Sequence, residues 1–248
     1  MATREYRFSK ASGSYQNNSA VQSRMARRLF DFIPRHSCFN EVLEVGCGTG
    51  NLSELLITEL KPLQLYLNDL SGGMLDCCRR RFSEYRGLNY CCGSILHSAF
   101  DCRFDLIIAN AVFQWIDDKY LLFRKLSDLL KENGLLIYSD FLPDNFPEIR
   151  TVTGCSLNYT SNETELLVLK ECGFKAQIRD VIISETFADP LALLRSFRNQ
   201  GVSGLSGRMW SKGKLEDFIR EYRRRFHCEN GEGVYLTWHP RYVVASRV

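Results

Sequence analysis

Residues 41–56, EVLEVGCGTGNLSELL, have the residue types and spacing that most directly suggest chemistry. A short buried strand is predicted to end at Val45, a helix is predicted to begin at Asn51, and Gly46, Gly48 and Gly50 stand between them. Glycine lets a ligand approach the backbone where a Cβ would block it. The helix that follows presents unpaired N–H groups to that ligand. The stretch therefore predicts a ligand-binding loop between a strand and a helix.

The acidic residues near this loop narrow the class of ligand. A dinucleotide-binding loop has the pattern G-x-G-x-x-G, but Asn51 stands where its third glycine would be. Glu44, just before the loop, would repel a pyrophosphate and suits an ammonium group. Asp69 ends the next predicted strand, where a carboxylate can accept from ribose hydroxyls or, alternatively, cap the following helix. A ligand with an ammonium end and a nucleoside end is S-adenosylmethionine, which is the expected cofactor.

Composition excludes several other classes of protein. With 248 residues and 45% hydrophobic content, the chain can bury a large core as one domain with insertions. The N-terminal MATREYRFSK is too polar for a secretory signal, and no apolar run is long enough to span a bilayer. The ten cysteines include no CxxC pair, so neither a disulfide scaffold nor a zinc site is expected. A cytoplasmic protein without a metal is the expectation, and the net charge of +3 indicates no particular partner.

The order of the predicted elements is typical of a parallel sheet covered on both faces, an α/β fold. Predicted strands cover residues 42–45, 63–67, 88–91, 104–109, 135–138, 177–187 and 235–245. Predicted helices cover residues 52–60, 73–82, 120–130, 163–172, 190–199 and 214–226. Residues 140–161, which contain two prolines, are expected to be irregular. We expect 140–161 and 188–233 to form a lid over the carboxyl ends of the strands, where such folds bind ligands.

Residues 40–140 resemble the class I S-adenosylmethionine-dependent methyltransferases. The glycine motif of that family stands here as VLEVGCGTG, residues 42–50, and its DLSxxML motif stands at residues 69–75. Gly93-Ser94-Ile95 fall where the family flanks the adenine, and Ser94 replaces an aspartate that many members have there. In FDLIIANAVFQWIDD, Asn110 and Ala111 stand where the family lines the methionine end, while Phe113 and Trp115 are expected in the core.

This resemblance implies a Rossmann-like sheet of seven strands, the last antiparallel to the rest, in a single domain of residues 1–248. Residues 1–36 would form an N-terminal helical cap and residues 40–139 the S-adenosylmethionine-binding core, with the two lid insertions following. The cofactor-binding residues that it implies are Glu44, Gly46, Cys47, Gly48, Gly50, Asp69, Leu70, Met74, Gly93, Ser94, Ile95, Asn110 and Ala111, with Gln22 from the cap.

A narrower resemblance lies outside the core. The segment FSKASGSYQNNSAVQ is similar to the N-terminus of the malonyl-acyl-carrier-protein O-methyltransferases of biotin synthesis, with Phe8, Ala11, Tyr15, Ala20 and Gln22 at the shared positions. FRNQGVSGLSGRMWSKGKL and VYLTWHPRYVVASRV resemble the inserted segment and final strand of that family. The resemblance implies methylation of the free carboxyl of malonyl-acyl-carrier protein. Related methyltransferases of quinone precursors and small acids share parts of these segments, and a non-catalytic S-adenosylmethionine-binding protein is a further alternative.

Carboxyl methylation does not require a general base from the side chains. An ionised carboxylate is already a nucleophile, so the protein must align the reacting atoms and exclude water. Tyr15 is the candidate for closing over the cofactor. Arg208 is the candidate for holding the malonyl carboxylate by a bidentate contact, with Arg150 and Arg198 as rivals. Trp238 and His239 could face the pocket, although a packed strand is the simpler expectation.

The predicted helix 214–226 has one apolar face and one mixed charged face. The charged face contains Arg220, Arg223 and Arg224 among acidic residues. Its interpretation is either a solvated surface or a docking site for an acidic carrier protein.

Overall fold

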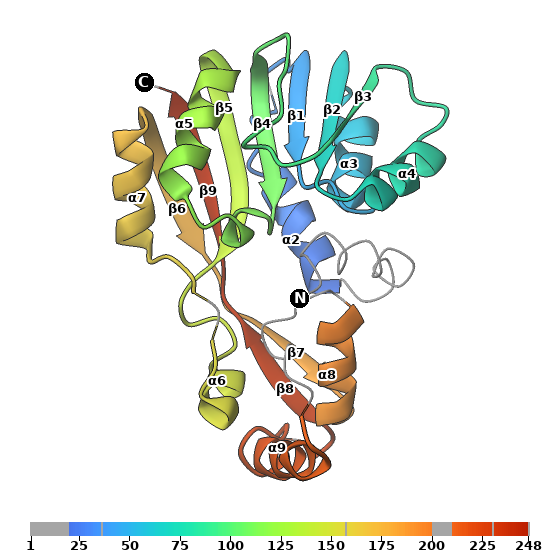
Figure 1. Cartoon of the computed structure of the whole chain (residues 1–248), viewed down its shortest axis with the longest axis vertical. Helices are drawn as coiled ribbons and strands as arrows, with labels where there is room; N and C mark the ends of the chain where they lie inside the picture. Colours follow the sequence, from blue (N-terminus) through green and yellow to red (C-terminus); the bar gives the residue numbers. More distant parts are fainter. Residues whose placement is uncertain (1–19, 36, 157, 200–209, 230, 248) are drawn as a thin grey trace.

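The computed structural model describes residues 20–35, 37–156, 158–199, 210–229 and 231–247. Its centre is a seven-stranded sheet in the order β3-β2-β1-β4-β5-β9-β6, and β9 is antiparallel to both of its neighbours (Figure 1). This topology confirms the predicted sheet. The strands are β1 (Glu41–Val45), β2 (Gln64–Asp69), β3 (Leu88–Cys92), β4 (Phe104–Asn110), β5 (Leu130–Phe141), β6 (Phe174–Asp180) and β9 (Pro240–Arg247).

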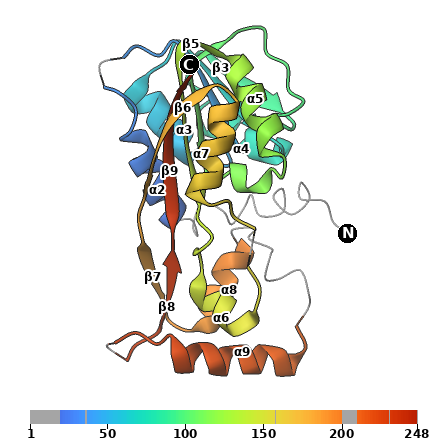
Figure 2. The same cartoon turned by 90° about the vertical axis from the view of Figure 1, so that its left-hand side faces the viewer.

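Helices cover both faces of this sheet (Figure 2). One buried cluster joins strand residues to α2 (Ala20–Phe30), α3 (Asn51–Leu55) and α4 (Gly72–Arg81), and α3 continues into the π-helical turn η2 (Leu56–Leu60). A second buried cluster joins the other faces of the strands to α5 (Lys119–Leu129) and α7 (Asn162–Glu171). Apolar residues on both faces of the strands, such as Val42 and Leu43, are what two such layers require.

The last two predicted strands are each divided in two, so their prediction as continuous strands was wrong. Residues 177–187 fall partly in β6 and partly in β7 (Ile183–Phe187), and residues 235–245 fall in β8 (Val234–Trp238) and β9. β7 and β8 pair with each other in a separate two-stranded sheet. The break lies where β5 ends, at the pair Phe141–Pro240, and proline has no N–H to continue a ladder.

Beyond this break lies a smaller unit made of α6 (Pro147–Thr153), β7, α8 (Pro190–Asn199), α9 (Lys212–Arg225) and β8, here called the small unit. It lies past the carboxyl ends of β1 and β4 (Figure 1). The expectation that residues 140–161 are irregular was wrong for α6. Pro147 occupies the first turn of that helix, where a missing N–H costs nothing. Within the described ranges, no helix is long and apolar enough to cross a membrane.

Candidate functional site

A cavity of about 470 Å³ lies at the carboxyl ends of β1, β2 and β4, between the central sheet and the small unit. Its volume is within the range of small-molecule sites. The chain leaves β1 toward β2 on one side and β4 lies on the other, which is the crevice where open α/β sheets bind ligands. The position of the cavity therefore follows from the strand order.

Most of the residues expected at a cofactor site line this cavity. They are Gln22, Gly46, Gly48, Asp69, Leu70, Met74, Gly93, Ser94, Ile95, Asn110 and Ala111. Glu44, Cys47 and Gly50 are not among its lining residues. Tyr15 and Arg208 lie outside the described residues. Arg150 and Arg198 do not line the cavity, and Arg150 instead contacts Pro143 and Asp144.

The glycine loop is joined to the end of β2 through Asp69. The backbone N–H of Gly48 donates to Asp69 Oδ2 over 2.9 Å, and the N–H of Ser71 donates to Oδ1 over 2.8 Å. Burial raises the pKa of Asp69, and these two donors oppose that shift. The carboxylate is thus held at the cavity wall in a fixed orientation.

All three loop glycines have positive φ, including Gly48 at 55°, and at two of them neighbouring side chains also leave no room for a Cβ. Gly46 and Gly50 both have positive φ, at 69° and 91°, which favours glycine. A Cβ on Gly46 would lie 2.4 Å from the Val112 side chain, and a Cβ on Gly50 would lie 2.6 Å from the ring of Phe82. The sequence pattern suggested that bare backbone makes room for a ligand. At these two positions it also makes room for neighbouring side chains.

Glu44 lies behind the loop and does not face the cavity. Its carboxylate is buried and accepts a hydrogen bond from Ser53 Oγ over 2.6 Å. Burial raises its pKa well above the usual range. The acidic groups on the cavity wall are instead Asp69, Asp117 and Asp118.

The N-terminal helix reaches the cavity through Gln22. The side-chain amide of Asn110 donates to the backbone oxygen of Gln22 over 3.1 Å, and Asn110 Oδ1 accepts from Ser139 Oγ over 2.7 Å. The next residue, Ala111, has a φ of 57°, in the left-handed region that non-glycine residues rarely adopt. Strain of this kind concentrates at functional sites. Through its hydrogen bond to Gln22, Asn110 joins the end of β4 to α2 at the cavity.

The far end of the cavity is aromatic, and the sequence did not identify most of it. Phe141, Phe146, Tyr159 and Trp238 line this end, which we call the aromatic end. Phe113 is buried in the core as expected, whereas the same expectation was wrong for Trp115, which is half-buried and lines the cavity. Of the four residues of the aromatic end, the sequence indicated only Trp238 as one that could face the pocket. Nothing in the local sequence indicates that they meet across the cavity.

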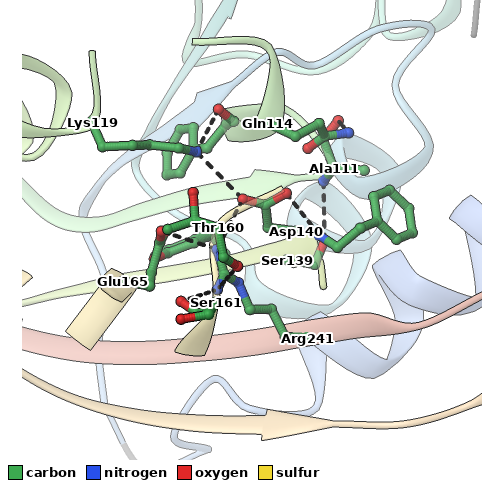
Figure 3. A network of polar contacts seen from close by, with 12 residues as sticks. Ala111, Gln114, Lys119, Ser139, Asp140, Thr160, Ser161, Glu165 and Arg241 are labelled. Carbon is green, nitrogen blue, oxygen red and sulfur yellow. Dashed lines mark hydrogen bonds and ion pairs between the residues drawn. The ribbon is translucent and has the colours of Figure 1, made fainter. Parts of the chain in front are cut away.

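A buried polar network lies beside the aromatic end (Figure 3). Arg241 is fully buried and forms ion pairs with Asp140 over 3.3 Å and with Glu165 over 3.0 Å. Lys119 lies 3.4 Å from Asp140 and donates to the backbone oxygen of Phe113 over 2.7 Å. Such a network costs desolvation but fixes the relative positions of its members. It ties the cavity wall at residues 113–119 to the end of β5, to β9 and to α7.

Comparison with known proteins is consistent with this geometry. Residues 43–136 match the family model described as a methyltransferase domain. A malonyl-[acyl-carrier protein] O-methyltransferase of Bacteroides fragilis is 33% identical over 97% of this chain and 49% of its own length, so the chain spans about half of that relative. The enzyme of the same name from Chlorobium luteolum is 33% identical over 95% of this chain and 91% of its own length. A solved structure of a putative methyltransferase of Bacillus halodurans has the same fold, with a TM-score of 0.64 and 16% identity over 89% of this chain and 97% of that one.

The lining also fits S-adenosylmethionine. Its charged members are three carboxylates, and the described lining includes neither lysine nor arginine. Such a wall suits a ligand that is cationic at its sulfonium and ammonium groups and disfavours a pyrophosphate. Gln114 adds a buried side-chain oxygen without a hydrogen-bond partner among the described atoms. That oxygen is available to accept from a bound ligand.

Proposed function

The chain belongs to the family of malonyl-[acyl-carrier protein] O-methyltransferases, and we propose that it methylates the free carboxyl of a malonyl group on acyl-carrier protein. It is an S-adenosylmethionine-dependent methyltransferase. The observation that carries the proposal is similarity over nearly the whole chain to a relative of matching length. Masking one carboxyl of malonate as an ester would allow chain extension toward biotin.

The cofactor contacts that we propose follow from the lining of the cavity. Asp69 accepts from the ribose hydroxyls, Ser94 and Ile95 flank the adenine, and Asn110 with Ala111 lines the methionine end. Glu44 supports the loop from behind through Ser53, so its role is to position the glycine loop. Bound S-adenosylmethionine would supply a methyl group activated by the sulfonium.

Beyond holding the cofactor, the protein must align the acceptor carboxylate with the methyl group. A carboxylate needs no general base, so the side chains of the aromatic end serve to exclude water and to orient the acceptor. Phe146 has a φ of 58° at the first position before α6, and its ring packs edge-on against Trp238 at 4.6 Å. We propose that the small unit acts as a lid on this end of the cavity, and that Tyr15 and Arg208 complete it.

The partner that we propose is an acidic carrier protein docking on α9. This helix lies at the outer edge of the small unit, packed on α6 and α8 (Figure 1). Arg223 is exposed and has no ion-pair partner among the described residues, whereas Arg220 and Arg224 are paired with Asp217 and Glu221. Positive charge on the small unit would accelerate encounter with an acidic partner.

One observation favours a second acceptor class. The described cavity wall carries no cation to meet a carboxylate, which favours an uncharged acceptor such as the phenol of a quinone precursor. The two proposals are separated by comparing kcat/KM for malonyl-carrier protein, malonyl-coenzyme A, free malonate and a phenolic quinone precursor. A value for malonyl-carrier protein above the other three supports the first proposal. A higher value for the phenol overturns it.

A further inference from the structure

The aromatic end contains two side chains with a polar proton, and only one of those protons has a partner. The indole N–H of Trp238 donates to Glu185 Oε2 over 2.9 Å. The hydroxyl of Tyr159 accepts a hydrogen bond from Asn145 Nδ2 over 3.1 Å. Its own proton has no acceptor among the residues that the structure describes. Tyr159 is half-buried and lines the cavity, so its free proton is available to a ligand that binds there.

The orientation of Asn145 fixes the orientation of this hydroxyl. Asn145 is buried, and its Oδ1 accepts from the backbone N–H of His239 over 2.9 Å. The amide group of Asn145 must therefore point its NH₂ toward Tyr159, because the reverse orientation would set the NH₂ against the N–H donor of His239. With one lone pair of the phenol oxygen engaged by Asn145, the Tyr159 proton points away from Asn145.

The main chain beside Tyr159 is held equally firmly. The buried guanidinium of Arg241 donates through Nη1 to the carbonyl oxygens of Thr160 over 2.9 Å and Ser161 over 3.2 Å (Figure 3). The Tyr159 ring packs edge-on against Phe141, with ring centroids 6.0 Å apart. Tyr159 is thus held at its ring and its hydroxyl, and the main chain that follows it is anchored by Arg241, before any ligand arrives. A binding group gains most when it is positioned in advance in this way.

On these contacts, and resting on the proposed function, we propose that Tyr159 is a substrate-binding residue whose hydroxyl donates a hydrogen bond to the carboxylate that becomes methylated. Burial also raises the pKa of Tyr159, so the phenol keeps its proton at neutral pH. The neutral phenol can donate a hydrogen bond to a carboxylate, whereas an ionised phenolate would repel it.

The reaction determines which kinetic constant should respond. A new bond forms between one carboxylate oxygen and the methyl carbon as the bond from that carbon to sulfur breaks, and no proton is transferred. The carboxylate loses its negative charge during this step, so a hydrogen bond to it is stronger in the bound substrate than in the transition state. Tyr159 should therefore lower KM and should not increase kcat.

The test is Tyr159→Phe, which keeps the ring and removes only the hydroxyl. The KM for malonyl-carrier protein should rise about 10-fold, as expected for losing a hydrogen bond to a charged group. The kcat should stay within about twofold of wild type, and the affinity for S-adenosylmethionine should not change. Tyr85→Phe is the matched control, because that hydroxyl donates to the Pro62 carbonyl and Tyr85 does not line the cavity. It should leave both kinetic constants unchanged.

A second readout does not depend on turnover. Binding of a malonyl thioester of pantetheine is measured by calorimetry on protein saturated with S-adenosylhomocysteine, and Tyr159→Phe should weaken it about 10-fold. If wild type is active and Tyr159→Phe matches it in KM and in thioester binding, the role of Tyr159 is overturned and the proposed function stands. If wild type neither methylates malonyl-carrier protein nor binds the thioester, the proposed function fails and this inference fails with it.

Discussion

Gly48 and Asp69 meet at the wall of the cavity: the backbone N–H of Gly48 donates to Asp69 Oδ2 over 2.9 Å. These residues belong to the loop after β1 and to the end of β2, so one hydrogen bond joins the two motifs that the sequence placed at the cofactor. The same carboxylate receives the N–H of Ser71 at Oδ1. Its position is fixed by the backbone, which leaves its remaining lone pairs to a ligand.

We expect Asp69→Ala to weaken binding of S-adenosylmethionine by about 1.5–3 kcal/mol, because charge-assisted hydrogen bonds to the ribose are lost. The variant should remain folded, since the surrounding strands keep their ladder hydrogen bonds. Calorimetric titration measures the affinity, and circular dichroism checks the fold. An unchanged affinity in a folded variant would remove the ribose role.

Alanine substitutions at two glycines, one inside the cavity and one outside it, test whether the cofactor lies against Gly93. Gly93 and Gly154 both have positive φ, and a Cβ on either would have no atom within 4 Å, but only Gly93 lines the cavity. Alanine at either position should cost about 1–2 kcal/mol of unfolding free energy from backbone strain. Only Gly93→Ala places a methyl in the cavity, and we expect it to weaken the binding of S-adenosylmethionine roughly 10-fold. Equal affinities of the two variants would mean that residue 93 does not face the cofactor.

The buried carboxyl of Glu44 predicts a pH-dependent stability. Because burial raises its pKa, the folded state favours the protonated form. Its contribution to stability is therefore fully present below the ordinary carboxyl pKa and is lost as the pH rises through the raised value.

Glu44→Gln keeps the shape of the side chain and cannot ionise. Its unfolding free energy relative to wild type should increase as the pH rises above about 4.5, with a slope of at most about 1.4 kcal/mol per pH unit. Urea unfolding between about pH 4 and 8 measures this difference. A difference that does not vary with pH would show that the carboxylate is solvated.

Docking on α9 is tested by reversing charge on its exposed face. Changing Arg223 and Arg224 to Glu should raise the KM for malonyl-carrier protein roughly 3- to 10-fold and leave kcat unchanged, because rim charges act on encounter. Activity on malonyl-pantetheine should not change. Added salt should reduce the difference between variant and wild type.

The control for this pair is Arg35→Glu with Arg86→Glu, which changes the net charge equally. Both residues are exposed and precede β1 and β3, at the opposite edge of the sheet from the cavity. They should leave the KM unaffected. If both double variants raise it to the same extent, net charge is responsible and α9 is a solvated face.

The sequence predicted the parts of the fold that depend on short-range pattern. Each central strand is a short apolar run followed by a turn signal, so its existence is visible without its partners. The split between β8 and β9 is different, because Pro240 is its only local signal in a run that otherwise looks like one strand. It depends on the end of β5 at Phe141, about a hundred residues away in the chain.

The cavity likewise has one end that local sequence patterns predict and one end that they do not. The cofactor end is made of loops that follow consecutive strands, so local motifs identify Gly48, Asp69 and Ser94. The aromatic end brings residues 141, 146, 159 and 238 together by tertiary packing, which no local pattern encodes. Glu44 shows a further limit: a strand-end carboxylate can face either side of the loop, and Ser53 determines which.

The most direct test is incubation of the protein with methyl-labelled S-adenosylmethionine and malonyl-carrier protein, followed by mass spectrometry of the carrier. We expect the carrier to gain one labelled methyl, and we expect esterase treatment to remove it, because the new bond is an ester. Acetyl-carrier protein, which has no free carboxyl, should gain nothing. A labelled methyl that resists esterase, or equal labelling of the acetyl carrier, would contradict carboxyl methylation. Absence of label on the malonyl carrier would do the same.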